Sequence, residues 1–157
     1  MTVQLVNAPA SHKHIVKNLL QLYIYDFSEY VNCDVEDDGL YAYPHFEDYW
    51  LNDNRFAYLV VKDEKYAGFV FVKFVAEPSR SYFSIAEFFV LKKYRRTGIG
   101  KNIAHQIFNL HRGQWEVFEM ENNKPAQLFW HSVINEYTSG AFTERFENKR
   151  LIQSFEN

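Results

Sequence analysis

The feature of this sequence that most constrains its fold is a strand-like run that leads through a basic, glycine-containing turn into a helix-like segment. The run extends from Tyr82 to Leu91, and the turn extends from Arg95 to Lys101. A helix that starts at such a turn offers free backbone N–H groups and a partial positive charge, which suit a phosphate group. We therefore expect a nucleotide or pyrophosphate ligand here. The helix is predicted from apolar residues at three-to-four spacing after Gly98, namely Ile99, Ile103, Ile107 and Leu110.

The residues of the turn have the properties that phosphate binding needs. Gly98 and Gly100 allow the backbone to approach phosphate oxygens or to adopt positive φ. Arg95, Arg96 and Lys101 are predicted to add mobile positive charge. An ordinary basic helix start is the alternative, because a short pattern can also occur by chance.

Two common phosphate-binding patterns do not fit this turn. A Walker A loop ending at Gly100-Lys101 needs Gly at position 95 and Ser or Thr at position 102, where the chain has Arg95 and Asn102. A dinucleotide fingerprint beginning at Gly98 needs a third Gly at position 103, where the chain has Ile103. The pattern that remains is R-x-x-G-x-G.

One carboxylate interrupts the apolar strand before the turn. Strict two-residue alternation places Glu87 on one face with Phe83, Ile85, Phe89 and Leu91. A buried, unpaired carboxylate has a raised pKa, and beside a cleft it can act as a general base, directly or through a water. The alternative is a Glu that is salt-bridged to a neighbouring strand or turned outward by a bulge.

A second amphipathic helix is predicted after the strand-like run from Trp115 to Met120. Asn123 is expected to be its N-cap, and Pro125 falls in the first turn, where proline is tolerated. The apolar residues then follow helical spacing and predict one buried face, formed by Ala126, Phe129, Trp130, Val133, Ile134 and Tyr137.

These patterns, in this order, resemble the two signatures of the GNAT superfamily of N-acetyltransferases. The first is Ile85 to Val90 followed by Arg95 to Gly100, and the second is Asn123-x-x-Ala126-x-x-Phe129-Trp130. The resemblance covers residues 82–137 well and the rest in pattern only. It implies acetyl-CoA as co-substrate, with its pyrophosphate at the turn and its pantetheine arm along the end of the strand. The cofactor-binding residues it implies are Phe89, Val90, Leu91, Arg95, Arg96, Thr97, Gly98, Ile99, Gly100, Lys101, Asn123, Ala126, Phe129 and Trp130.

One departure from the family pattern concerns the acid that protonates the departing CoA thiolate. The family's usual Tyr in the second signature is replaced by Trp130, whose indole N–H is no useful acid near neutral pH. Tyr137 is on the same helix face and is a weak candidate, because seven residues place it about 10 Å along the helix. Tyr94, a tyrosine between residues 23 and 43, or water are alternatives. A thiolate with a pKa near 8.5 needs little help.

The predicted reaction is transfer of acetyl from acetyl-CoA to a primary amine by direct attack, with Glu87 as candidate general base. The segment 23–43 interleaves aromatic and acidic residues, which can steer and hold a cationic amine, although a solvated acidic loop over core aromatics is the alternative. Because the usual Tyr is missing, a non-catalytic acyl-CoA-binding or regulatory module remains the rival function. A structural domain whose basic turn binds no nucleotide is a third, weaker one.

Composition narrows the class of protein further. The net charge of −3, with residues of both signs, does not favour nucleic-acid binding. The single cysteine, Cys33, fits a reducing compartment, and no segment approaches the roughly 20 apolar residues of a membrane helix, so we expect a cytoplasmic protein without a membrane partner. The His residues lack metal-ligand spacing, so no metal site is expected. Aromatic residues make up 18% of the chain and suit a core, a substrate cleft or a dimer face, which leaves a homodimer open.

The whole chain is predicted to be one α/β (α+β) domain over residues 1–157. The expected order is β-α-α-β-β-β-α-β-α-β-β, with a mixed, mainly antiparallel sheet flanked by helices, as in the GNAT fold. The clearest hairpin is the pair of runs from Arg55 to Lys62 and from Lys65 to Ala76. Gly68 within the second run is expected to mark a bulge or a close backbone approach.

Overall fold

The computed structural model describes residues 2–157 and contains seven strands that form one sheet. The strand order is β1-β2-β3-β4-β5-β7-β6, and every neighbouring pair except β4–β5 is antiparallel. The predicted element order and the mixed, mainly antiparallel sheet are confirmed. The elements are β1 Val3–Asn7, α1 Lys13–Phe27, α2 Asp48–Leu51, β2 Arg55–Lys62, β3 Lys65–Ala76, β4 Ser81–Val90, α3 Ile99–Leu110, β5 Gln114–Met120, α4 Lys124–Thr138, β6 Thr143–Glu147 and β7 Arg150–Glu156, with short 3-10 turns at Ala10–His12 and Lys92–Tyr94.

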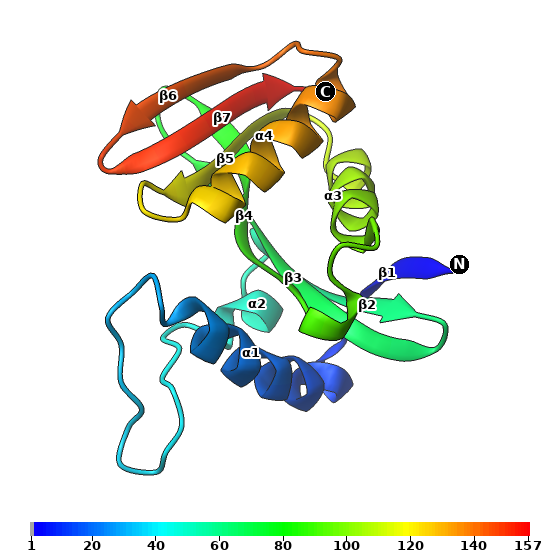
Figure 1. Ribbon diagram of the computed structural model, residues 1–157, viewed down its shortest axis with the longest axis vertical. Coiled ribbons are helices and arrows are strands. Elements are labelled where there is room, and N and C mark those ends of the chain that lie inside the picture. The colour runs from blue at the N-terminus through cyan, green and yellow to red at the C-terminus, as the bar shows by residue number, and fades with distance from the viewer. Residues whose placement is uncertain (1) are drawn as a thin grey trace.

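Helices cover both faces of the sheet (Figure 1). On one face, Leu20 of α1 packs in a cluster with Phe69 of β3. On the other face, Ile103 of α3 and Ile134 of α4 pack in a cluster with Val70 of β3. β3 is therefore buried on both sides, which explains why its sequence is an almost continuous apolar run. Within residues 2–157, no helix is both long and apolar enough to cross a membrane.

A β-bulge in β4 decides which way Glu87 points. Phe71 of β3 pairs with Glu87, but the next residue, Val72, pairs with Ile85, so Ala86 is the extra residue. Phe83 and Ile85 consequently pack with α3 and α4, whereas Glu87 and every second residue after it face the side of α1. The prediction that all five alternating residues share one face was wrong, because strict alternation cannot anticipate an inserted residue.

The sheet opens between β4 and β5. These parallel strands have one registered pair, Phe83 with Trp115, whereas β5 and β7 pair over seven residues. The edge of β4 from Ser84 to Val90 that points away from β3 therefore pairs with no other strand of the part of the chain that is described. Figure 1 shows the two halves of the sheet diverging from this place, with α1 and α2 beside one half and α4 beside the other.

Gly68 marks a close backbone approach, as predicted. A Cβ atom at this position would lie 1.9 Å from the carbonyl oxygen of Phe89 in β4. The register between β2 and β3 also shifts next to it, between Val60 and Val61. Only glycine allows β3 and β4 to pair here at normal spacing.

Candidate active site

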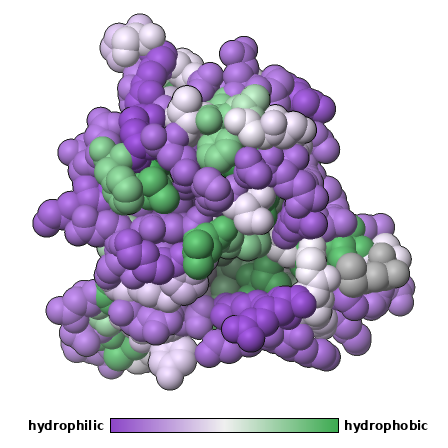
Figure 2. All heavy atoms as spheres, turned by 45° about the horizontal axis from the view of Figure 1, so that its top comes forward, coloured by the Kyte–Doolittle hydropathy of each residue, from purple (hydrophilic) through white to green (hydrophobic). Residues whose placement is uncertain are grey.

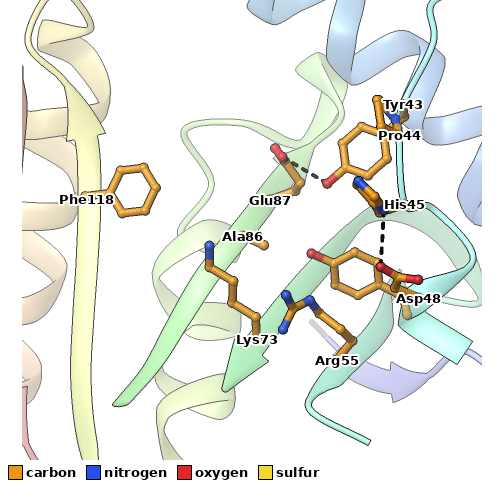
Figure 3. Close-up of a pocket in the computed structure, with 10 residues that line it drawn as sticks. Tyr43, Pro44, His45, Asp48, Arg55, Lys73, Ala86, Glu87 and Phe118 are labelled. Atoms are coloured by element: carbon orange, nitrogen blue, oxygen red, sulfur yellow. Dashed lines mark hydrogen bonds and ion pairs between the residues drawn. The ribbon is translucent and has the colours of Figure 1, made fainter. Parts of the chain in front are cut away.

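A pocket of about 440 Å³ lies on the α1 side of the sheet, where the bulge of β4 meets the segment before α2. Its centre is Glu87, which points from β4 toward Tyr43 in Figure 3, with Phe118 of β5 on the opposite side. The pocket is lined by Tyr43, Pro44, His45, Asp48, Tyr49, Arg55, Lys73, Ala86, Glu87 and Phe118.

Glu87 is a half-buried carboxylate held by phenol hydroxyl groups. The Tyr43 hydroxyl donates a hydrogen bond to Oε1 at 3.2 Å. Burial raises the pKa of Glu87, and hydrogen bonding from Tyr23 and Tyr43 together with the charge of Lys73 opposes that rise. The chain has no ion pair to Glu87 within 4 Å among residues 2–157. A carboxylate in this setting can accept a proton near neutral pH more readily than an exposed one.

The tyrosines of the pocket remain protonated over the ordinary pH range. Burial, and then the charge of Glu87, raises the pKa of Tyr43. Burial also raises the pKa of Tyr49 to about 12, and the ring of Tyr49 stacks on Phe71 at 3.8 Å between centroids. Both phenols are therefore hydrogen-bond donors and poor proton donors, and of the two it is Tyr43 that donates to Glu87.

The segment 23–43 contributes tyrosines to the site, whereas its acidic residues lie elsewhere. Asp26 forms ion pairs with Arg95 at 2.7 Å and with Lys92 at 3.6 Å. The other acids of the segment after α1, Asp34 to Asp38, are exposed and line no part of the pocket. Most of this segment is therefore a solvated acidic loop above core aromatics. Tyr23 and Tyr43 differ from the rest, because their hydroxyl groups interact with Glu87.

The turn before α3 has the backbone geometry of an anion site. Gly98 has a φ of +85° at the N-cap position, and a Cβ there would meet nothing within 4 Å. The amide groups of Arg96, Thr97 and Gly98 donate to no backbone carbonyl of the chain as described. The first amide groups of α3 are also free, because the N–H groups in the first turn of a helix have no carbonyl partner within the helix. Glycine at position 100 serves packing instead, because a Cβ there would lie 3.1 Å from the ring of Phe129 in α4.

The basic residues of the turn are less mobile than predicted. The Arg95 side chain donates from Nε to the carbonyl oxygen of Val90 at 2.8 Å and forms the ion pair with Asp26. Lys101 approaches Glu136 of α4 at 3.2 Å. Arg95 thus ties the turn to the end of β4 and to α1, and the prediction of mobile charge was wrong for it. Arg96 is exposed and has a φ of +61°, and the Thr97 hydroxyl donates to the carbonyl of Tyr94 at 2.6 Å.

The end of β4 has fewer free backbone groups than its residues alone suggest. The Val90 carbonyl is occupied by Arg95, and the Leu91 amide donates to the Ala67 carbonyl at 2.8 Å. The Phe89 side chain is buried under α1 beside Tyr23. A ligand along this edge therefore has to use the groups of β4 that face away from β3.

Comparisons with known proteins agree with this arrangement. The model of the acetyltransferase (GNAT) family matches residues 18–133. The chain belongs to the GNAT acetyltransferase family. A comparison with curated protein sequences finds no match.

Solved structures of GNAT acetyltransferases and other acetyltransferases share the fold at low sequence identity. An acetyltransferase from Thermus thermophilus matches with a TM-score of 0.69 at 12% identity, covering 100% of this chain and 98% of that one. The PaiA N-acetyltransferase of Thermoplasma acidophilum in complex with coenzyme A matches with a TM-score of 0.68 at 9% identity, covering 100% of both chains. An aminoglycoside acetyltransferase from an uncultured soil metagenomic sample, in complex with sisomicin, has a TM-score of 0.61 at 16% identity, covering 83% of this chain and 86% of that one.

This GNAT protein is an acetyl-CoA-dependent acetyltransferase, with acetyl-CoA as its co-substrate. Its own residues fit that ligand, because the turn from Arg96 to Gly98 has unoccupied amides at the start of a helix, where a pyrophosphate is stabilised. In the space-filling view of Figure 2, a hollow with hydrophobic residues at its floor is framed by hydrophilic ones. Across residues 2–157, no group of three or more His, Cys, Asp or Glu residues is arranged to hold a metal ion.

The segment that resembles the second signature of the GNAT family forms the start of α4. Asn123 is its N-cap as predicted, and its side chain accepts from the Ala126 amide at 3.2 Å. Trp130 is buried against Phe88, with 4.9 Å between centroids, and Phe129 packs on Gly100. These aromatic side chains fasten α4 to β4 and α3.

Tyr137, the weak candidate for the acid, lies away from the pocket around Glu87. Its hydroxyl donates to Asn109 at 2.8 Å and accepts from Asn157 at 3.0 Å, and its ring packs on Phe108. It does not line the pocket around Glu87. Its interactions give it a structural role at the end of α4.

Most of the pocket residues are not singled out by the sequence, and Arg55, Lys73 and Phe118 are the clearest examples. The sequence predicts Arg55 and Lys73 only as residues of a hairpin, and Phe118 only as a residue of a strand. Two-residue alternation from Phe71 could have placed Lys73 beside Glu87, but that required knowing that β3 and β4 are neighbours with a bulge between them. A lysine inside an otherwise apolar run is the available clue in the sequence.

Proposed function

We propose that this protein transfers the acetyl group of acetyl-CoA to a primary amine by direct attack, with Glu87 as the general base. The observation that carries the proposal is the position of Glu87. The bulge at Ala86 turns its carboxylate into a pocket beside the open edge of β4, where burial raises its pKa and tyrosine hydroxyls hold it. We take residues 1–157 as one such N-acyltransferase domain.

In the proposed reaction, the amine nitrogen attacks the carbonyl carbon of the thioester. A C–N bond forms, the C–S bond breaks and CoA leaves as its thiolate. The amine arrives as a cationic ammonium group, and Glu87 takes a proton from it, directly or through a water, so that the nitrogen has a free electron pair. The nitrogen loses a second proton as the tetrahedral intermediate collapses, and this proton goes to water or to the departing thiolate. The aromatic faces of Tyr43 and Tyr49 support binding of that cation.

The proposed CoA site uses the turn and the two helix starts that flank the open edge of β4. The amides of Arg96 to Lys101 bind the pyrophosphate, with Arg95 holding the turn in shape. The edge of Phe89, Val90 and Leu91 and the start of α4 at Asn123, Ala126, Phe129 and Trp130 flank the pantetheine arm. Because the pocket tyrosines are poor acids and Tyr137 is distant, the thiolate leaves without a dedicated proton donor, which its ordinary pKa permits.

The test of the base is Glu87→Gln, which keeps the shape of the side chain and removes its basicity. We expect kcat/KM for an amine to fall by about 10²- to 10⁴-fold. The acid limb of the pH profile should also disappear, because that limb reports ionisation of the base. Glu64→Gln, in the exposed turn between β2 and β3, is the matched control. Unchanged turnover of Glu87→Gln across pH 6 to 9 would remove Glu87 from the mechanism.

The replacement of the family's Tyr by Trp130 favours one second candidate, a module that binds acyl-CoA without turnover. Thermal unfolding with acetyl-CoA, CoA, ATP and NADPH separates the possibilities. A specific ligand at about 100 times its dissociation constant stabilises the fold by about 2.7 kcal/mol, a shift of several degrees. A shift with the two CoA species together with thiol release from an amine panel supports the enzyme, whereas a shift without any thiol release supports the module.

A further inference from the structure

Two cationic side chains are directly opposed on neighbouring strands near the acceptor pocket. Arg55 of β2 pairs with Lys73 of β3, and both side chains line the pocket around Glu87. Like charges at directly opposed positions of an antiparallel pair are destabilising. The pKa of Lys73 is lowered by burial and by the charges of Arg55 and Arg150. The charge of Glu87 opposes this effect on Lys73. A bound anion would offset the repulsion further.

A buried hydroxyl group without a partner lies on the other side of Lys73. Lys73 pairs across the β3–β4 ladder with Ser84, which is 1% exposed, and the Ser84 Oγ atom has no hydrogen-bond partner. Both residues line a second pocket of about 330 Å³. Buried hydroxyl groups are normally hydrogen-bonded, so an orphaned one that lines a pocket indicates a missing ligand group or water.

A third cation faces the same space from the other half of the sheet. The guanidinium of Arg150 in β7 lies over the ring of Phe118 at 4.3 Å, and the Lys73 ammonium lies 6.0 Å from the same ring. Phe118 lines both pockets, as does Lys73, so the two pockets adjoin at these residues. In Figure 3 the end of the Lys73 side chain lies between Phe118 and the strand that carries Glu87.

Most of the acidic residues nearby already have other partners. Glu116 accepts from Arg80 and from Arg145, and Glu147 accepts from Arg145 at 2.9 Å. Glu77 pairs with Arg80, and Asp48 lies 3.6 Å from His45. Glu87 is the remaining acid of the two pockets, and its charge acts on Lys73 without an ion pair within 4 Å. Within residues 2–157, Arg55, Lys73 and Arg150 form no ion pair within 4 Å.

We propose that Lys73, Arg55, Arg150 and Ser84 form an anion subsite, which binds a carboxylate or phosphate group of the acceptor while the acceptor's amine lies at Glu87. The acceptor is then a zwitterion, and this proposal rests on the proposed function for the amine half. The subsite is separate from the CoA pyrophosphate site, because β4 runs about 20 Å from Ser84 to Val90 at 3.3 Å per residue.

The experiment measures kcat/KM for matched amines with and without the anion. The pairs are 4-aminobutyrate with 4-aminobutanamide, L-alanine with L-alaninamide, and O-phosphoethanolamine with ethanolamine. Each ratio of charged to uncharged amine is compared between wild type and variants, so that differences in amine basicity cancel. The first two pairs report on a carboxylate, and the third pair reports on a phosphate.

We expect wild type to prefer the charged member of at least one pair. Lys73→Met should reduce that ratio at least tenfold, Arg150→Met and Ser84→Ala should reduce it by smaller factors, and Lys65→Met, an exposed position of the same strand, should leave it unchanged. Lys73→Met should also unfold at a higher temperature than wild type, because it removes like-charge repulsion. Equal use of both members by wild type, or an unchanged ratio in Lys73→Met, overturns the subsite.

A binding measurement separates failure of the subsite from failure of the proposed function. If no amine is turned over, glutarate and inorganic phosphate are titrated into wild type and Lys73→Met by calorimetry. Binding by wild type that is lost in Lys73→Met supports the anion subsite while the proposed amine transfer fails. Absence of binding, or equal binding by both proteins, overturns the subsite.

Discussion

At the scale of single residues, the carboxylate of Glu87 is controlled by hydroxyl groups more than by charges. Burial raises its pKa, and Tyr23 and Tyr43 hold that rise in check by stabilising the ionised form. As the proposed base, Glu87 must be ionised to act, so we expect activity to fall as the pH falls through this raised pKa. In this proposal the tyrosines set the lower end of the working pH range.

Removal of one hydroxyl should move that limit upward. In Tyr43→Phe the ionised Glu87 loses a donor, and a hydrogen bond to a charged group is worth about 1.5 kcal/mol or more, equivalent to about one pKa unit. The acid limb of kcat/KM should shift to higher pH by about one unit. The profile at high pH should stay in place. Tyr66→Phe, at an exposed position near the start of β3, is the control. An acid limb of Tyr43→Phe at the wild-type pH would contradict the role assigned to Tyr43.

A second buried carboxylate, Glu119, affects stability and lies outside the pocket. Burial raises its pKa to about 8, the hydrogen bond from Gln153 at 2.9 Å opposes the rise, and its other oxygen has no partner. In the unfolded chain a Glu titrates near 4.3, so between that pH and 8 the folded protein binds the extra proton. Its stabilising effect is complete below the unfolded value and is lost as the pH rises through about 8.

Urea unfolding at a series of pH values tests this assignment. The contribution of Glu119 predicts that wild-type stability falls by about 1.4 kcal/mol per pH unit across that window. Glu119→Gln cannot ionise, so its slope should be flatter and it should be more stable than wild type above pH 8. The exposed Glu121→Gln should keep the wild-type slope. If Glu119→Gln and wild type lose stability in parallel, the raised pKa is wrong.

At the scale of elements, the pairing of β3 with β4 requires a residue without a side chain at position 68, which Gly68 provides. Gly68→Ala would place a methyl group 1.9 Å from the Phe89 carbonyl oxygen, and backbone cannot move aside as a side chain can. We expect a loss of stability of about 3 kcal/mol or more, within the range of severe backbone and overpacking changes. Chemical denaturation measures it. Tyr66→Ala, two residues earlier and exposed, should cost far less, and similar losses in the two variants would exclude a backbone clash as the cause.

The elements themselves follow from local sequence, whereas the direction of Glu87 does not. Alternating and helical spacing predicted the hairpin of β2 and β3, the helix after Gly98 and the N-cap Asn123 because these depend on neighbouring residues. The bulge at Ala86 depends on how β4 pairs with β3, which no local pattern reveals. The same reason explains Arg95, whose partners Val90 and Asp26 are brought to it only by the folded chain.

The cationic cluster could not be predicted because it is assembled from distant segments. Arg55, Lys73 and Arg150 come from three strands, and β7 reaches the site only through its pairing with β5. Each residue alone is an ordinary charge at a strand position. A prediction of cationic acceptors from the acidic segment 23–43 considered composition alone, and the fold places most of those acids away from the pocket.

At the scale of the whole molecule, the two halves of the sheet meet through the single registered pair of β4 and β5. A ligand that lies along the open edge of β4 and binds at the turn before α3 connects both halves. Hydrogen exchange should therefore slow on addition of acetyl-CoA at amides from Ser84 to Val90 and from Arg96 to Lys101. The outer strand β6 should not change, and ATP should have no effect. Exchange at the open edge that is unaffected by acetyl-CoA would contradict the proposed path of the ligand.

The extra residue at Ala86 also bears on how such a site can change over generations. Deletion of Ala86 would leave Phe71 opposite Glu87 and Val72 opposite Ile85, because these pairs are already set on either side of the extra residue. Glu87 would then keep its face, and only the local distortion of β4 would be lost. The pairing partner of Glu87, more than the number of residues that precede it in β4, keeps its carboxylate on the side of α1.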